Sequence, residues 1–287
     1  MFSLMLGMGL TLSVEDFRRI ALAPAATLLG TLLQLVGMPL AGLALALAYG
    51  LPPLLAAGLM IVAACPGGLF SNMYVHLAGG NTALSITLTA SATMVTLFTL
   101  PVWVHLVLAA VGGDEASVDL PILGSALRLA SFTVLPVACG MLLRHRAPEL
   151  LRFEKWLARV SAVLIVVGVT VDALGQPDPP IAQFRQSLPP ALWLLAAAAA
   201  SGLLVPRLLR LGTRDAVTIT VELLVKNGLL GLVLARQSLA FDATIPILAF
   251  ITLQTPIAIA VLVAWRLLER RNNRAASRES LRSGDVG

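Results

Sequence analysis

The sequence predicts an all-α polytopic membrane protein, and three observations lead to this prediction. The 287 residues are 58% hydrophobic and only 12% charged, whereas a soluble domain carries about 25% charged residues. Apolar runs of about 20 residues, long enough to cross a bilayer as helices, recur along the whole chain. Glycine and proline fall inside these runs, as helical membrane proteins tolerate, and the strand-like alternation of a β-barrel is absent.

The apolar runs predict about nine transmembrane helices. We expect these helices to cover about residues 1–12, 21–49, 54–78, 83–111, 120–143, 158–174, 188–211, 216–234 and 243–268. The first run is short for a span, so either it is a thin helix or the native chain starts upstream. Residues 1–269 would form the transmembrane domain. Residues 270–287 would form a polar cytoplasmic tail, disordered beyond its first turn.

Loop charges predict the orientation of these helices. Basic residues cluster at Arg18-Arg19, between Arg144 and Lys155, between Arg207 and Arg214, and from Arg266 onwards. Because cytoplasmic loops carry an excess of Lys and Arg, we expect a multi-pass plasma (inner) membrane protein with its N-terminus outside and its C-terminus in the cytoplasm. The same loops account for the net charge of +5. The expected partner is therefore a lipid bilayer and not a nucleic acid.

Two of the predicted spans contain breaks. Pro66-Gly67-Gly68 interrupts one span and Ser71-Asn72 follow it, and the polar, glycine-containing stretch Glu222–Gly231 lies in the other. A broken helix at membrane depth is tolerated only where it is buried in protein or lines a cavity. Interrupted segments at corresponding places predict two repeated halves with a binding site at the midplane. The repeats would cover about residues 1–112 and 117–269.

Glu222 and Lys226 form the most unusual pair in the chain. An ionisable side chain at bilayer depth is costly unless it is paired or lines a wet cavity. The two residues are four positions apart, so they would share one face if this stretch is helical. An ion or substrate site and a purely structural ion pair both explain the pair.

These motifs resemble the bile acid:sodium symporter family. The resemblance rests on Gly7–Leu12 with Glu15-Asp16-Phe17, Gln34 to Pro39, Cys65–Gly68 with Ser71-Asn72, Ala83-Leu84-Ser85 with Thr89, and Thr218–Glu222 with Asn227. It implies an inverted-repeat transporter with panel and core domains and two crossing broken helices, and with the first helix of the family missing. It also implies a secondary active transporter that carries a small organic anion, bile-acid-like or a small carboxylate, with sodium.

The resemblance implies two sodium sites. The first would be formed by oxygen-bearing side chains: Ser71, Asn72, Ser85, Thr89 and Glu222. The second would use Gln34, Glu222 and the main-chain carbonyls at Leu223 and Val225, but Lys226 stands where the family has a glutamine. An ammonium carries the charge of Na⁺ and offers only donors. We therefore expect Lys226, satisfied by Glu222 and Gln34, to replace the second ion. One sodium, or a proton if Lys226 titrates on burial, would then drive transport.

The resemblance also implies a substrate position beside the breaks, at Leu69, Phe70, Asn227 and Gly228. Leu69-Phe70 stand where the family often has threonine and alanine, and Gly228-Leu229 where it often has Ser-Gly. The position is therefore less polar than in the family, and the family's known substrates do not transfer directly to this chain.

Three further functions remain open at this stage. The first is a proton-coupled or sodium-independent anion transporter, and the second is a non-transporting membrane sensor of the same fold. The third, a membrane enzyme, is disfavoured because the three histidines and two cysteines are scattered and form no catalytic or metal-binding pattern.

Overall fold

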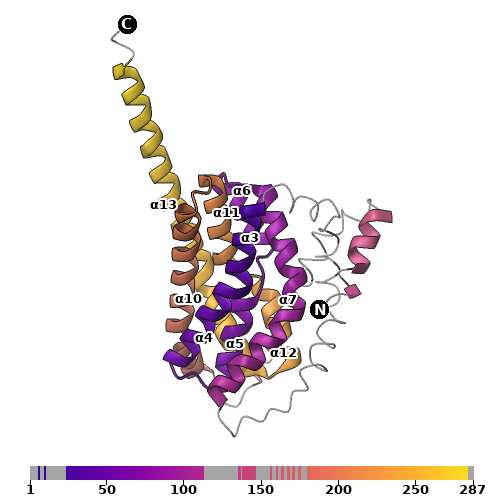
Figure 1. The fold of residues 1–287 in the computed structure, drawn as a ribbon. Helices are drawn as coiled ribbons and strands as arrows, with labels where there is room; N and C mark the ends of the chain where they lie inside the picture. Colours follow the sequence, from indigo (N-terminus) through magenta and orange to yellow (C-terminus); the bar gives the residue numbers. More distant parts are fainter. Residues whose placement is uncertain are drawn as a thin grey trace.

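The structure, a computed structural model, describes residues 24–112 and 180–283 together with isolated residues and short pieces elsewhere (Figure 1). Every regular element in the two continuous ranges is a helix, which confirms the all-α class. In the first range the elements are α3 (Pro24–Leu32), η1 (Leu33–Gly37), α4 (Met38–Ala48), α5 (Pro53–Ala64), α6 (Leu69–Ala78) and α7 (Thr82–Gly112). In the second they are α10 (Ile181–Leu208), α11 (Thr213–Leu224), α12 (Gly228–Ser238), η4 (Phe241–Thr244) and α13 (Ile245–Ser283).

Three helical stretches in the described residues are long and apolar enough to cross a membrane, at Ala25–Ala48, Ile181–Leu208 and Phe241–Leu267. A fourth is possible if the two halves of α7, bent by 61° between Thr96 and Phe98, count as one span. Pro101 explains the bend. Its ring clashes with the carbonyl of the residue four positions earlier, and it has no backbone N–H to donate a hydrogen bond to that carbonyl. The predicted spans 1–12, 120–143 and 158–174 fall wholly or mostly outside the described residues.

Two helix limits differ from the prediction. Helix α10 begins at Ile181, seven residues before the expected start, directly after Pro180. Helix α13 continues to Ser283 and extends well beyond the rest of the bundle (Figure 1), so the expectation of a tail that is disordered beyond its first turn is wrong. Residues 269–283 contain Glu, Arg and Ala and neither Gly nor Pro. Extending an existing helix through such residues avoids the cost of nucleation.

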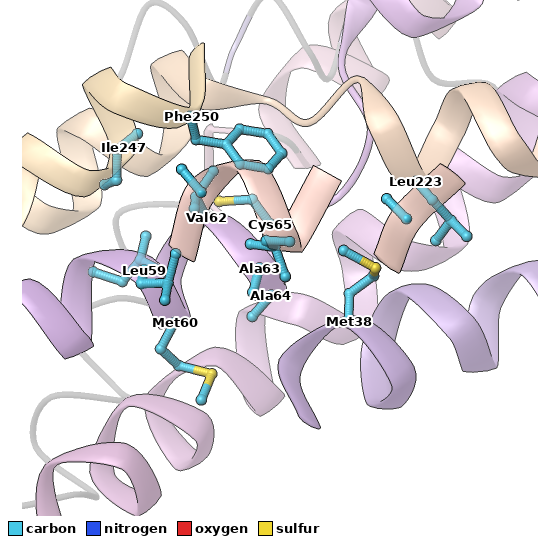
Figure 2. Packing of buried hydrophobic residues seen from close by; sticks show 14 of the residues in the cluster. Met38, Leu59, Met60, Val62, Ala63, Ala64, Cys65, Leu223, Ile247 and Phe250 are labelled. Atoms are coloured by element: carbon cyan, nitrogen blue, oxygen red, sulfur yellow. The ribbon is translucent and has the colours of Figure 1, made fainter. Parts of the chain in front are cut away.

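Helix α5 lies at the centre of the core. Its residues from Leu55 to Ala64 are all buried. Figure 2 shows Phe250 of α13 facing Val62 and Cys65 at the end of α5. Close packing depends on small residues, because a Cβ atom on Gly58 would collide with the main chain at Ala243, as is usual for helix contacts in membranes. The core thereby fixes the end of α5, where the first break begins.

Candidate cation site

The two breaks cross each other. The first, Cys65–Gly68, separates α5 from α6, and the second, Val225–Asn227, separates α11 from α12. Gly67 and Lys226 form an isolated antiparallel bridge, and the backbone N–H of Asn227 donates to the carbonyl of Pro66 at 2.9 Å. The two breaks thus meet directly, whereas the inverted-repeat relation of the two halves and their panel and core domains stay predictions.

Local chemistry explains where three of the four helices at the breaks begin or end. Cys65 precedes a proline and has extended backbone angles, φ −60° and ψ 142°, as residues before proline prefer. Gly68 is also extended and lies directly before α6. Asn227 caps α12, since its side-chain oxygen accepts a hydrogen bond from the N–H of Leu230 at 3.1 Å. The peptide groups freed by the breaks are thus partly satisfied by each other.

The carboxylate of Glu222 lies beside this crossing, at the end of α11, and is fully buried. It accepts hydrogen bonds from three hydroxyl groups on two other helices. Ser71 Oγ lies 2.8 Å and Ser85 Oγ 2.5 Å from Oε1, and Thr89 Oγ1 lies 3.0 Å from Oε2. Ser85 Oγ is also 2.6 Å from Asn72 Oδ1. The structure therefore brings together all five residues predicted for the first sodium site.

Two hydroxyl groups of this cluster lie within hydrogen-bond distance of two acceptor oxygens each, although each hydroxyl has one proton to donate. Ser71 Oγ lies within hydrogen-bond distance of both Gly68 O and Glu222, and Ser85 Oγ of both Asn72 and Glu222. Each hydroxyl carries a single proton and two acceptor lone pairs, so oxygen lone pairs outnumber donors around Glu222. Carboxylate, hydroxyl and amide oxygens are the ligands that hard cations prefer. The arrangement can therefore bind a small cation such as Na⁺.

Gly67 leaves room for the carboxylate. A Cβ atom at this position would collide with Glu222 Oε2 and would lie 2.9 Å from Ser71 Oγ. We expect Gly67→Ala to displace the carboxylate and to weaken sodium binding about tenfold or more, because binding sites depend on sub-ångström ligand placement. The measurement is the rise in melting temperature of the purified protein with sodium concentration.

Gly231→Ala is the matched control for Gly67→Ala. An added Cβ atom there meets Ile247 and Cys65 at 3.4 and 3.5 Å, which is ordinary van der Waals contact, and α12 tolerates alanine. This variant should keep the sodium response of the wild type. Equal sodium responses of Gly67→Ala and the wild type would contradict the placement of the site.

Lys226 does not pair with Glu222 or Gln34 as expected. The side chain is 2% exposed, and its Nζ atom has no hydrogen-bond partner within the described structure. The reason is that α11 ends at Leu224, so the four-residue helical spacing no longer applies at Lys226. Its backbone N–H instead donates to Gln254 Oε1 of α13 at 3.1 Å. The ammonium still interacts electrostatically with the carboxylate of Glu222.

Gln34 lies in the π-helical turn η1 and is 1% exposed, and neither atom of its side-chain amide has a hydrogen-bond partner in the described residues. The turn is stabilised from α7, because Trp103 Nε1 donates to the carbonyl of Leu35 at 3.0 Å. Pro39 cannot donate to that carbonyl, since it lacks an N–H group. One turn before Gln34, a Cβ atom added to Gly30 would lie 3.3 Å from Ile219 of α11, so this part of the helix packs close to α11. Gln34 is thus near α11 without a direct bond to Lys226.

The four residues predicted for the substrate position have different surroundings. Phe70 is 63% exposed, and Asn227 is half-buried and lies against Gly68. Gly228 packs directly against Ile251 of α13 and so offers no surface of its own. The side chain of Leu69 lies outside the described structure. Among the members of this set whose surroundings the structure describes, Phe70 and Asn227 are therefore the ones that are exposed or half-buried beside the crossing.

Sequence reasoning missed several contacts of the site. Gln254 lies within the predicted span 243–268 and Trp103 within the predicted span 83–111, and neither residue gave a signal of its role. Asn81, in the turn between α6 and α7, hydrogen bonds with Thr218 and Asp215 of α11. A polar residue after two glycines suggests a turn, but nothing local indicates its partners.

Comparisons of the sequence with known proteins identify its relatives. The sequence model of the sodium bile acid symporter family matches residues 1–176. The chain is 33% identical over 234 residues to the probable sodium/metabolite cotransporter BASS1, chloroplastic, of Oryza sativa subsp. japonica, covering 81% of the chain and 56% of that protein. It is 31% identical over 168 residues to the uncharacterized sodium-dependent transporter YocS of Bacillus subtilis, covering 58% and 48%. It is 28% identical over 167 residues to the human ileal sodium/bile acid cotransporter, covering 58% and 47%. The chain thus spans about half the length of the curated relatives it matches.

Proposed function

Because the chain belongs to the sodium bile acid symporter family, we propose that it is a secondary active transporter that carries a small organic anion together with sodium. Membership of a transporter family sets aside the interpretation as a membrane enzyme. The observation that supports the proposal most strongly is the buried Glu222 carboxylate, surrounded by three hydroxyl groups and next to an amide at the crossing of two helix breaks.

Sodium would bind among Glu222, Ser71, Asn72, Ser85 and Thr89. The hydroxyl groups that now donate to Glu222 would rotate and present lone pairs to the ion, as a hydroxyl can do. The ion would also neutralise a carboxylate that is otherwise buried at a cost. Since the ligands come from α6, α7 and α11, bound sodium would hold these helices together and fix the crossing against which the anion binds.

Lys226 would supply the charge of a second sodium ion. Its ammonium is buried, has no hydrogen-bond partner in the described structure, and interacts electrostatically with Glu222. A permanent charge near Glu222 disfavours a second mobile cation there. One sodium ion would then accompany each anion, and a monovalent anion would cross the membrane without net charge.

The anion would bind beside Phe70 and Asn227, next to the crossing. An exposed aromatic ring beside a polar cap suits a small carboxylate or a bile-acid-like anion, which combine an apolar body with one charge. We place the transporter in a plasma (inner) membrane with the C-terminal end of α13 in the cytoplasm, where the excess of arginine favours it.

An uptake screen in proteoliposomes tests this function. Radiolabelled small carboxylates and steroid anions are offered to vesicles with an inward sodium gradient or with an equal potassium gradient. We expect at least one anion to accumulate above its external concentration with sodium only. Binding of an anion without accumulation would identify a sensor, and accumulation driven by protons alone would identify a proton-coupled transporter; either result would contradict the proposal.

A further inference from the structure

The turn between α6 and α7 is hydrogen-bonded to the first turns of α11 through one residue, Asn81. We propose that Asn81 is a positioning residue that sets the register of α7 against α11, and so the geometry of the sodium site one helical turn away. This inference rests on the proposed function, because the consequence that matters is the placement of sodium ligands.

Asn81 makes three hydrogen bonds, with its backbone N–H and with both polar atoms of its side chain. Its backbone N–H donates to Thr218 Oγ1 at 2.8 Å, and its side-chain Nδ2 donates to Asp215 Oδ1 at 2.8 Å. Its side-chain Oδ1 accepts from the N–H of Leu84 at 3.1 Å, which makes Asn81 the cap of α7. One residue therefore caps the helix that carries Ser85 and binds the helix that carries Glu222.

The spacing of these contacts extends directly into the sodium site. Ser85 follows Asn81 by four residues, and Glu222 follows Thr218 by four residues. Two hydrogen bonds join these helices at the same sequence separation of 137 residues. One links Asn81 to Thr218, and the other links Ser85 to Glu222. Residues four apart lie one turn apart on the same helix face. The two helices therefore run side by side in one direction, and a slip at Asn81 would move Ser85 relative to Glu222.

The same turn also anchors α6, which carries Ser71 and Asn72. Helix α6 ends at Gly79, whose φ of 74° is left-handed, and the N–H of Gly80 returns to the carbonyl of Val75 at 3.0 Å. A Cβ atom on Gly80 would lie 2.8 Å from Thr218 Oγ1, so the turn packs closely on α11. The contacts of Asn81 thereby position ligands from both α6 and α7 against Glu222.

A reciprocal exchange tests the role of Asn81. Asn81→Asp places a carboxylate against Asp215 and should weaken sodium binding about tenfold, within the range measured for coupled contacts. Asp215→Asn alone keeps an amide pair and should change sodium binding about twofold or less. The double variant Asn81→Asp with Asp215→Asn restores a carboxylate–amide pair with the roles exchanged and keeps a capping oxygen. It should recover the sodium affinity of the wild type.

Two readouts separate positioning from general stability. The first is the sodium concentration for half-maximal stabilisation of the detergent-purified protein. The second is the distance between spin labels at Ala83→Cys and Arg214→Cys in a Cys139→Ser background. Both labelled positions are exposed, and the remaining Cys65 is buried. We expect Asn81→Asp to shift or broaden this distance and the double variant to restore it.

The outcomes distinguish the two proposals. If the wild type responds to sodium and Asn81→Asp responds at the same concentrations, the positioning role is overturned. If the double variant does not recover the sodium affinity, the pairing with Asp215 is overturned. A wild type that does not respond to sodium contradicts the proposed function. In that case only the distance between the spin labels tests the role of Asn81. An unchanged distance in Asn81→Asp overturns the positioning role.

Discussion

Glu222→Gln is expected to reduce sodium-driven uptake by about 100-fold or more, the largest effect of any single substitution in this chain. The bound sodium ion would lose the only charged ligand among the five residues of the first site, and in a buried site an ion interacts far more strongly with a carboxylate than with a neutral amide. Glutamine has nearly the same shape, so the packing around α11 is retained. Its NH₂ group would, however, lie where a carboxylate oxygen now accepts from Ser85 or Thr89. An NH₂ group can only donate hydrogen bonds, so it cannot serve as a ligand of the sodium ion.

Stability measurements separate this loss from misfolding. Without sodium, Glu222→Gln should still unfold in one cooperative transition, because the amide has nearly the same shape as the carboxylate and the packing of α11 is retained. With sodium, only the wild type should gain stability. Asp242→Asn is the matched control, since this carboxylate lies in η4, outside the cluster. Sodium-driven uptake by Glu222→Gln at the wild-type rate would show that the carboxylate is not the sodium ligand.

Lys226→Gln is expected to raise the Hill coefficient for sodium from about one to about two, because the Hill coefficient cannot exceed the number of coupled sites. Glutamine would remove the fixed charge and offer an amide oxygen where the resemblance implies a second sodium site. Gln34, whose amide has no hydrogen-bond partner in the described residues, would then share a second ion. Uptake of a monovalent anion should change at the same time from electroneutral to driven by membrane potential.

Lys226→Met is the control for the second site. Methionine removes the charge but supplies no oxygen, so uptake should keep a Hill coefficient of about one. The measurement is initial uptake rate against sodium concentration, repeated with a potassium diffusion potential of either sign. A wild-type Hill coefficient near two would overturn the replacement of a sodium ion by Lys226, as would an unchanged coefficient in Lys226→Gln.

Some of this structure follows directly from the sequence. Composition and apolar runs predict the all-α membrane fold, and Pro66-Gly67-Gly68 predicts the first break, since proline and glycine act on the local backbone. The grouping of Ser71, Ser85 and Glu222 is different. It came from the resemblance to a family, because side chains more than a hundred residues apart share no local signal.

The exact position of the second break does not follow from the local sequence. Leu223-Leu-Val-Lys226 contains no helix breaker, yet α11 ends at Leu224. The end is imposed by the partner segment, through the bridge of Lys226 to Gly67 and the bond from Asn227 to Pro66. Tertiary contacts of this kind override local propensity. That is why the expected pairing of Lys226 with Glu222 was wrong.

The central claim is that the cluster around Glu222 is a sodium site, and equilibrium sodium binding to the purified protein tests it without knowledge of the substrate. The unfolding free energy of the wild type is measured against sodium concentration, with potassium and choline as controls at constant ionic strength. A ligand that binds only the folded state stabilises it in proportion to the logarithm of its concentration, with a slope set by the number of ions. The account predicts a one-ion slope for sodium alone and no slope in Glu222→Gln. A wild type that sodium stabilises no more than potassium would contradict it.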